Sequence, residues 1–185
     1  MTSTLHIKQA CRALNAGGVI AYPTEAVWGL GCEPLNEHAC LKLLLLKQRD
    51  AGKGVILIAS DFEQLAPYLA DVPPKTLEPA LARWPGPATW IVPASSRVPR
   101  WITGGRDTLA VRVTAHPLAA ALCRAYGGAL VSTSANRSGR PPARSALQVR
   151  KQLGHGLDYV LAGPLGGRSK PTPIRDLMTG KLLRA

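Results

Sequence analysis

Residues 36–59 read NEHACLKLLLLKQRDAGKGVILIA, a pattern that predicts a helix, a basic turn and a buried strand in succession. Asn36 is a favourable N-cap for a helix that continues to about Lys47. The run Leu43–Leu46 makes this helix apolar nearly all round, so we expect it to be buried. Residues 55–59 are apolar at every position, as in a central strand covered on both faces. A helix followed by such a strand is typical of an α/β fold.

The alternation of helical and extended patterns continues on both sides of this stretch. We expect further helices over 5–16, from an N-cap at Asp61 through a proline-punctuated stretch to Trp84, over 117–126, and from a cap at Ser145 to about Leu153. We expect further strands over 19–22, 89–92, 109–113, 129–134 and 159–161. Because no linker, internal repeat or low-complexity tract interrupts them, these elements predict a single α/β domain with a mixed sheet.

The composition favours a globular protein with an anionic partner. The chain has 185 residues, and its hydrophobic fraction of 46% is enough for a core without disulfides or metal ions. It carries 23 Lys and Arg against 11 Asp and Glu, a formal net charge of +12. This surplus favours nucleic acid, nucleotide phosphates or an acidic surface as the partner, and an arginine-rich proteome is the alternative explanation. An aromatic content of 5% argues against a surface that stacks single-stranded bases.

The cysteines and the apolar runs predict a cytoplasmic protein that does not cross a membrane. Cys11, Cys32, Cys40 and Cys123 form no C-x-x-C pair, so they indicate reduced core residues and neither a zinc site nor a redox motif. The N-terminal residues do not resemble a signal peptide. The longest apolar run, Leu43–Leu46, is far shorter than the roughly 20 residues of a membrane span.

Familiar nucleotide-binding and metal-binding signatures are absent from the sequence. Without a G-x-x-x-x-G-K-[ST] segment the chain is not a P-loop NTPase. Gly29 and Gly31 begin a G-x-G-x-x-G, but Pro34 occupies the third glycine position, so we reject a dinucleotide fingerprint. There is no H-E-x-x-H and no EF-hand loop, and we identify no metal ligands.

Residues 22–31, YPTEAVWGLG, are interpreted as a loop that follows a predicted strand. A turn packed by Val27 and Trp28, with glycines that permit positive φ, explains the pattern structurally. Loops on rigid strands also carry binding groups, so the residues leave both interpretations open.

A cluster of cations, Lys47, Arg49 and Lys53, lies at and just beyond the end of the helix predicted over 36–47. One cation there would be explained by the helix dipole, an effect of about 0.3–1 kcal/mol. Three cations within seven residues favour a polyphosphate clamp instead, with Arg49 binding oxygens in a fork and the lysines acting as point charges.

Short polar side chains follow one another at the end of the strand predicted over 129–134. Ser132, Ser134 and Asn136 are two residues apart, so on an extended chain they share one face. Buried hydroxyl and amide groups need partners, and ligands of α/β sheets bind at the carboxyl ends of strands. We favour a binding row, and a strand that ends in an Asx-type turn before Gly139 is the alternative.

Arg112 is a cation inside the otherwise apolar strand 109–113. Its burial requires a partner, and either a structural carboxylate or a substrate carboxylate would satisfy it. The four histidines are scattered through the sequence and are interpreted as surface or cap positions, so no histidine base is indicated.

Seven motifs, in this order, resemble the YrdC family. They are residues 22–31, Lys47-x-Arg49, Pro85-Gly86-Pro87, Ala110-Val111-Arg112, Ser134-x-Asn136, Pro171 to Asp176, and Leu183-Arg184. The resemblance covers residues 5–185 and is closest to the short, single-domain bacterial form without an extra C-terminal domain. It implies a single YrdC-like domain, in which a twisted mixed β-sheet and flanking helices surround a large, basic, concave cavity.

The resemblance also implies an enzyme, a nucleotidyltransferase. Members of this form combine L-threonine, bicarbonate or CO₂, and ATP into threonylcarbamoyl-adenylate and diphosphate, with Mg²⁺ accompanying the ATP. This is the first step in the threonylcarbamoyladenosine (t6A) modification of tRNA. A separate tRNA-modifying transferase complex then passes the threonylcarbamoyl group to the adenosine beside the anticodon.

The resemblance assigns roles to residues that match the family motifs. Lys47 and Arg49 are expected to be catalytic, because they neutralise the charge that develops on the leaving diphosphate. ATP is expected to bind to Lys47, Arg49, Lys53, Thr108, Ser134, Asn136 and Arg184. Threonine is expected to bind to Thr24, Arg112, Ser132 and Thr172.

Two other functions are compatible with the sequence. The net charge of +12 is also expected for an RNA-binding module in rRNA or tRNA maturation, with a non-catalytic nucleotide pocket. Direct RNA binding is also compatible with synthase activity. Hydrolysis, or carbamoyl transfer to another amino acid, would keep the pocket and change the substrate.

Overall fold

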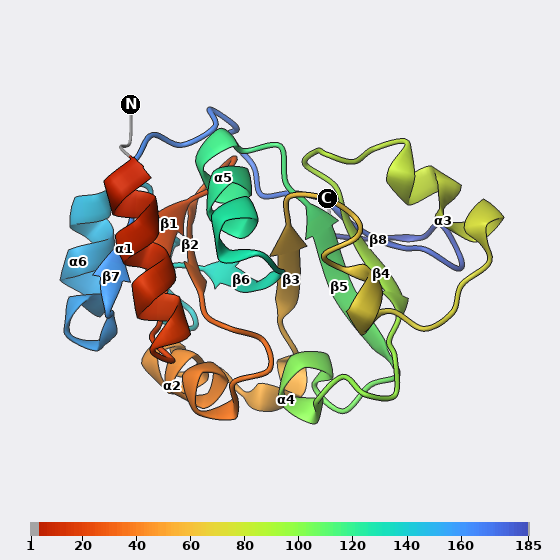
Figure 1. Ribbon diagram of the computed structural model, residues 1–185, viewed down its shortest axis with the longest axis horizontal. Coiled ribbons are helices and arrows are strands. Elements are labelled where there is room, and N and C mark those ends of the chain that lie inside the picture. The colour runs from red at the N-terminus through yellow and green to blue at the C-terminus, as the bar shows by residue number, and fades with distance from the viewer. Residues whose placement is uncertain (1–3, 185) are drawn as a thin grey trace.

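The computed structural model describes residues 4–184, which form a mixed sheet flanked by helices (Figure 1). In spatial order the sheet contains β7 (Tyr159–Val160), β1 (Ile20–Pro23), β2 (Trp28–Gly31), β6 (Leu130–Ser134), β3 (Ile56–Ala59), β5 (Thr108–Val113), β4 (Thr89–Pro93), β8 (Ile174–Asp176) and β9 (Leu182–Arg184). The pairs β1–β7, β3–β5 and β4–β8 are parallel and the other neighbours are antiparallel. The prediction of an α/β fold with a mixed sheet is confirmed.

The helices lie mostly where the sequence predicts them. They are α1 (Thr4–Asn15), α2 (Glu37–Lys47), α3 (Pro74–Leu81), α4 (Arg100–Thr103), α5 (Pro117–Tyr126) and α6 (Ala146–Leu153), with short 3₁₀ turns at Ala51–Lys53, Ala66–Tyr68 and Gly154–Gly156. The side chain of Asn36 accepts a hydrogen bond from the main-chain N–H of Ala39, and Ser145 caps α6 in the same way through Gln148. Both predicted caps are therefore confirmed, because a capping oxygen satisfies an N–H that has no partner inside its helix.

One face of the sheet is covered by α1 and α5, which lie side by side in front of the strands in Figure 1. The core beneath them contains the fully buried side chains of Leu14, Tyr22, Ile58, Leu122 and Leu130. Burial of each leucine or isoleucine side chain in this list stabilises the fold by roughly 1.5–3 kcal/mol. This layer fixes α1 and α5 to β1, β3 and β6.

The second apolar cluster joins α2 to the central strands. It includes Leu43 and Leu44 together with Leu57, Val111 and Val131. The expectation that the whole run 43–46 is buried is wrong, since the side chain of Leu45 is 78% exposed. The reason is that α2 packs on the sheet along one side only, so its outer face remains in solvent.

Two predictions of local structure are wrong. Residues 22–31 form a loop only over 24–27, because the residues on either side belong to β1 and β2, which pair as a hairpin in which Tyr22 lies opposite Gly29. No helix begins at Asp61, whose carboxylate accepts a hydrogen bond from the N–H of Gln64 in a turn. Such a turn uses the same capping contact as a helix, so the capping residue alone does not separate the two.

Some elements carry no pattern that predicts them. The helix α4 and the strands β8 and β9 have three or four residues each, too few to show a period. They are stabilised by neighbouring segments, since β8 pairs with β4 and β9 with β8.

The cysteines agree with the prediction of reduced core residues. All four are free, and Cys32, Cys40 and Cys123 are buried.

Within residues 4–184, no helix has both the length and the apolar character needed to cross a membrane.

Candidate functional site

A cavity of about 630 Å³ opens on the sheet and is lined from several strands. Its cationic lining side chains come from the turn after α2, the α4–β5 connection, β5 and β9: Arg49, Lys53, Arg106, Arg112 and Arg184. Among the lining residues of the described chain one carboxylate is present, that of Asp176. A concave surface with this charge balance is suited to an anionic ligand, because low-dielectric walls strengthen the field of clustered cations.

Most of the binding residues that were predicted from the sequence lie around this cavity. Those that line it are Thr24, Arg49, Lys53, Thr108, Arg112, Ser132, Ser134, Thr172 and Arg184. Lys47 and Asn136 do not line the cavity. Both of them contact Ser134, which does line it. The fold thus brings together residues from positions 24 to 184 that are far apart in the sequence.

The alternation of strand residues explains the floor of the cavity. On β5, Thr108, Ala110 and Arg112 follow one another at intervals of two residues, so all three share one face. Ala110 lies opposite Ile56 of β3, which in turn lies opposite Ser132 of β6. The predicted row is therefore seen for Ser132 and Ser134, but β6 ends at Ser134, before Asn136.

Lys47 is buried, with 2% of its surface exposed, and its ammonium group is surrounded by oxygen atoms. It donates hydrogen bonds to the main-chain carbonyls of Ser134 and Asn136 and to the side-chain oxygen of Asn136. Burial, together with the charge of Arg49, lowers the pKa of Lys47 to about 8. In this arrangement the lysine holds the end of β6 and does not line the cavity.

The side chain of Asn136 is occupied by its own loop. Its oxygen accepts a hydrogen bond from the hydroxyl of Ser134 at 2.6 Å. Its amide nitrogen donates to the carbonyls of Arg137 and Arg140 at 3.0 and 2.7 Å. The amide therefore sets the position of Ser134 and closes the turn over 137–140.

Two arginines hold the turn that carries Lys53. Arg49 donates from Nη2 to the carbonyl of Gly54 at 3.0 Å, and Arg106 donates from Nη2 to the carbonyl of Gly52 at 2.9 Å. Burial lowers the pKa of Arg49, and its Nε has no hydrogen-bond partner. Exposed Lys53 beside this guanidinium gives the corner a second cation for anionic oxygens.

Arg106 was missed by the sequence reasoning. It follows Gly104 and Gly105 and precedes β5, so no strand or helix period singles it out. Its side chain donates to the carbonyl of Thr103, three residues earlier, and to that of Gly52, which only the folded chain brings near.

At the other side of the cavity Arg112 is buried and makes two interactions. It donates from Nη1 to the hydroxyl of Thr172 at 3.0 Å, and its Nη2 lies 3.4 Å from Oε2 of Glu25. The sequence left open whether a structural carboxylate or a substrate carboxylate pairs with Arg112. A structural carboxylate, that of Glu25, is present. Arg184 donates from Nη2 to the carbonyl of Thr172, and burial and the charge of Arg112 lower its pKa.

Glu25 is the second residue that the sequence reasoning missed. It is 6% exposed, and its Oε1 accepts a hydrogen bond from the hydroxyl of Thr114 at 2.7 Å. Burial by itself would raise the pKa of Glu25, but the charge of Arg112 and the Thr114 hydrogen bond outweigh it and hold this pKa below the ordinary value. The signal in the sequence was a charged residue in the segment YPTEAVWGLG, directly after the strand predicted over 19–22.

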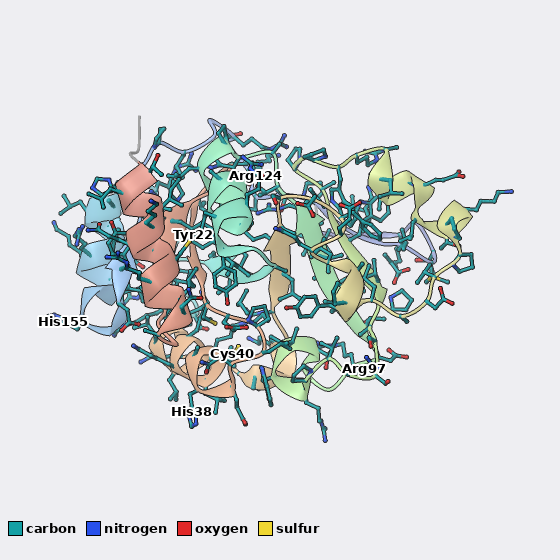
Figure 2. The ribbon with its side chains drawn as sticks, viewed as in Figure 1. Tyr22, His38, Cys40, Arg97, Arg124 and His155 are labelled. Carbon is teal, nitrogen blue, oxygen red and sulfur yellow. The ribbon has the colours of Figure 1, made fainter. Side chains whose placement is uncertain are left out.

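The histidines do not contribute to the lining in the described part of the chain. His38 and His155 are exposed at the periphery of the molecule (Figure 2). His116 caps α5 through Nδ1, and its Nε2–H donates to the carbonyl of Pro164, an arrangement of the neutral ring. Burial lowers the pKa of His116, which agrees with that form.

Comparison with protein families gives a match over most of the chain. The family model Sua5_yciO_yrdC, described as "Telomere recombination", matches residues 12–185. A protein of Halorhodospira halophila named threonylcarbamoyl-AMP synthase is 58% identical over 183 residues, 99% of this chain and 96% of that protein. A protein of Alkalilimnicola ehrlichii with the same name is 57% identical over 187 residues, 100% of this chain and 97% of that protein.

Solved structures give the same result for the fold. P. abyssi Sua5 complexed with L-threonine superposes with a TM-score of 0.90 at 34% identity, covering 96% of this chain and 53% of that one. The chain thus spans about half the length of that Sua5 protein. E. coli YciO superposes with a TM-score of 0.85 at 29% identity, covering 98% of this chain and 89% of that one. On the family match, the identities and these superpositions together, the chain belongs to the Sua5/YciO/YrdC family.

Proposed function

We propose that the chain is an enzyme that joins L-threonine, bicarbonate or CO₂, and ATP into threonylcarbamoyl-adenylate and diphosphate. The support is the identity of 58% and 57% to two proteins named threonylcarbamoyl-AMP synthase, over nearly their whole lengths. A 34% identical structure that binds L-threonine supports the amino-acid substrate. The observation in this chain that carries the proposal is one cavity with cations at two separate corners.

The chemistry requires two bonds to form in sequence. The neutral amine of threonine attacks the carbon of CO₂ or bicarbonate and gives a carbamate, with a proton released when CO₂ is used and water released when bicarbonate is used. A carbamate oxygen then attacks the α-phosphorus of ATP, and the bond from that phosphorus to the diphosphate oxygen breaks. This second step is a nucleotidyl transfer. Negative charge grows on the leaving diphosphate, so fixed cations and correct positioning are the main requirements.

The nucleotide is assigned to the corner formed by the turn after α2 and the end of β6. Arg49 and Lys53 would bind the phosphate oxygens, and Arg106 would add a third cation from the α4–β5 connection. Thr108, Ser134 and Arg184 would contact the remainder of the nucleotide. Lys47 and Asn136 would serve the nucleotide through Ser134, which both of them contact.

Threonine is assigned to the corner around Arg112. The guanidinium would bind the substrate carboxylate, which is the group it matches in charge and geometry. Thr24, Ser132 and Thr172 would complete this pocket with short polar side chains. No covalent intermediate with the protein is needed.

Mg²⁺ is proposed to accompany the ATP. Within residues 4–184 there is no group of three or more acidic, histidine or cysteine side chains that would hold a metal by itself. The lining does contain the carboxylate of Asp176, and oxygen is the ligand that Mg²⁺ prefers, usually together with substrate phosphates and water. Asp176 and phosphate oxygens would hold the ion, which would shield the phosphate charge.

The cellular role follows from the product. A mixed anhydride of a carbamate and AMP is a donor, so we propose that a separate transferase complex moves its threonylcarbamoyl group to tRNA for t6A synthesis. A single domain over 5–185 and a cytoplasmic location are part of this proposal, and the four free cysteines support that location.

The test is mass spectrometry of the purified protein with ATP, Mg²⁺, bicarbonate and L-threonine, with diphosphate release followed in parallel. The expected product has the mass of threonylcarbamoyl-adenylate and disappears when threonine is omitted. Replacement of threonine by serine or other amino acids tests the alternative substrates. Folded protein that forms neither product nor diphosphate, yet binds RNA with a steep salt dependence, would instead support the RNA-binding module.

A further inference from the structure

Glu25 is a buried acid that stands behind the proposed threonine pocket and has no role in the reaction described above. It does not line the cavity, whereas its neighbour Thr24 does. Its carboxylate lies between Arg112 of β5, which lines the cavity, and Thr114, which directly follows that strand. The acid is therefore separated from a bound ligand by the guanidinium of Arg112.

The contacts of Arg112 define how its guanidinium is oriented. Nη1 donates to the hydroxyl of Thr172, and Nη2 faces Oε2 of Glu25 at 3.4 Å. Nε is buried and has no hydrogen-bond partner. Because the guanidinium is planar, two fixed nitrogens fix the direction of the remaining N–H groups.

The carboxylate is itself fixed from the other side. The hydroxyl of Thr114 donates to Oε1 at 2.7 Å and accepts from the N–H of His116 at 3.2 Å. Oε2 has no hydrogen bond and meets Arg112 only through their charges. The chain of contacts runs from the start of α5 through Thr114 and Glu25 to the cavity.

We propose that Glu25 is a positioning residue that holds the guanidinium of Arg112 in the orientation in which it binds the carboxylate of the amino-acid substrate. This inference rests on the proposed function, since it assumes that Arg112 binds that carboxylate. It adds a residue outside the cavity lining that determines the affinity for the amino acid and leaves the nucleotide corner unaffected.

The geometry argues against a purely stabilising ion pair. A buried pair is often no better for stability than apolar side chains of the same volume, because both charges lose their hydration. Here the pair also leaves an acceptor on Glu25 and a donor on Arg112 without hydrogen bonds. Unsatisfied buried groups are uncommon in native proteins and call for an explanation, which a role of this pair in orienting Arg112 toward the cavity supplies.

The backbone around Glu25 is held independently of its side chain. The carbonyl of Glu25 accepts from the N–H of Arg168 at 2.9 Å, and the carbonyl of Thr24 accepts from the N–H of Gly166 at 3.0 Å. The substitution Glu25→Gln keeps the volume and the acceptor for Thr114 while it removes the charge. This variant is therefore expected to fold and to loosen only the orientation of Arg112.

The experiment compares the wild type with Glu25→Gln by calorimetric titration with L-threonine and by steady-state kinetics for threonine and ATP. We expect the threonine affinity to fall and its KM to rise at least about tenfold, with the KM for ATP within about twofold of the wild type. Thr114→Val removes a hydrogen bond from Glu25 without touching Arg112, and it should move the threonine KM in the same direction by a smaller factor. The matched control is Asp158→Asn, which removes a carboxylate paired with Lys42 outside the cavity and should leave both KM values unchanged.

The outcomes separate this inference from the proposed function. If the wild type binds no threonine and forms no product, the proposed function fails and this inference fails with it. If the wild type binds threonine and the folded Glu25→Gln variant binds it equally well, only the positioning role is overturned. Equal losses for threonine and ATP would also overturn it, because a general loosening of the fold does not discriminate between substrates. If Glu25→Gln does not fold, the threonine KM of Thr114→Val becomes the test. An unchanged threonine KM in that variant overturns the inference.

Discussion

The ammonium group of Lys47, in the last turn of α2, donates a hydrogen bond to the main-chain carbonyl of Asn136 at 2.9 Å, across 89 positions of the sequence. The same nitrogen also binds the carbonyl of Ser134 and the side-chain oxygen of Asn136. A helix end and a strand end are thus joined by one buried cation. This contact makes the position of Ser134 in the cavity depend on α2.

Lys47→Met is expected to weaken both stability and activity. It removes the lysine donor from three oxygen atoms near the end of β6. The Ser134 carbonyl and the Asn136 side-chain oxygen keep other donors, but the Asn136 carbonyl loses its hydrogen bond to Lys47, and an unsatisfied buried acceptor costs about 1–3 kcal/mol. Urea denaturation should show a loss of that size, and turnover should fall at least about tenfold because Ser134 shifts. The control is Lys42→Met on the same helix, whose exposed ion pair contributes about 1 kcal/mol or less. Wild-type stability in Lys47→Met would contradict the anchoring role.

Arg49→Ala should lower turnover at least about tenfold while the protein remains folded. The reason is that Arg49 lines the cavity, while its side chain contributes to the fold through a hydrogen bond to the carbonyl of Gly54. Diphosphate release measures the effect, and circular dichroism checks the fold. Arg97→Ala is the control, because Arg97 is exposed and lies outside the cavity lining (Figure 2). Unchanged turnover in folded Arg49→Ala would remove the phosphate role.

Asn136→Ala should weaken ATP binding more than threonine binding. Its amide holds the Ser134 hydroxyl and the turn over 137–140, which belong to the proposed nucleotide corner. Arg112 and Thr172, in the threonine corner, hydrogen-bond to one another, whereas the Asn136 side chain bonds within its own loop, so the threonine corner should be unaffected. Calorimetry with each substrate measures the two affinities, and the reverse order would transfer this residue to the amino-acid site.

Asp158→Asn should lower stability near neutral pH by an amount that shrinks on acidification. The carboxylate accepts from Lys42 and from the N–H of Val19, both at 2.6 Å. Burial alone would raise the pKa of Asp158, but these hydrogen bonds and the Lys42 charge hold it below the ordinary value of 3.8. A lowered pKa means that the stabilisation is present above pH 3.8 and is lost as the pH falls through the folded-state pKa.

The measurement is urea denaturation of the wild type and Asp158→Asn at pH 7 and at pH 3. Because both partners of the ion pair are more than a third exposed, a difference of about 1 kcal/mol or less is expected from the pair at pH 7. A difference that grows at pH 3 would show that the carboxylate is not stabilised in its charged form.

Gly31→Ala should destabilise the β1–β2 hairpin. A Cβ at this position would lie 2.5 Å from the carbonyl oxygen of Val131 and 2.8 Å from the ring of Tyr22, both in the packed sheet. Overpacking of this kind costs about 1–3 kcal/mol or more. Gly154→Ala is the matched control, since its φ is −54° and the nearest atom would lie 3.8 Å from the new Cβ. Equal melting temperatures for the two variants would contradict this packing.

Local patterns in the sequence were sufficient for much of the fold. The caps at Asn36 and Ser145, the buried strand at Ile56–Ala59 and the alternation that puts Ser132 and Ser134 on one face are all present in the structure. These features depend on the periods of helices and strands and on hydrogen bonds between near neighbours. The motifs that resemble the YrdC family likewise led to the family that the comparisons confirm.

The tertiary structure alone decided the remaining features of the site. The order of the strands brings Glu25 to Arg112 and Arg106 to Gly52, and it turns Lys47 away from the lining toward the end of β6. The helix and strand periods of the sequence do not predict such contacts. Each contact joins segments that approach one another only when distant strands pair. The sequence by itself determined the elements and the residue types of the site. Which charge faces the cavity and which is held by the protein was decided by the packing of the sheet, where a buried ion is stable only beside its partners.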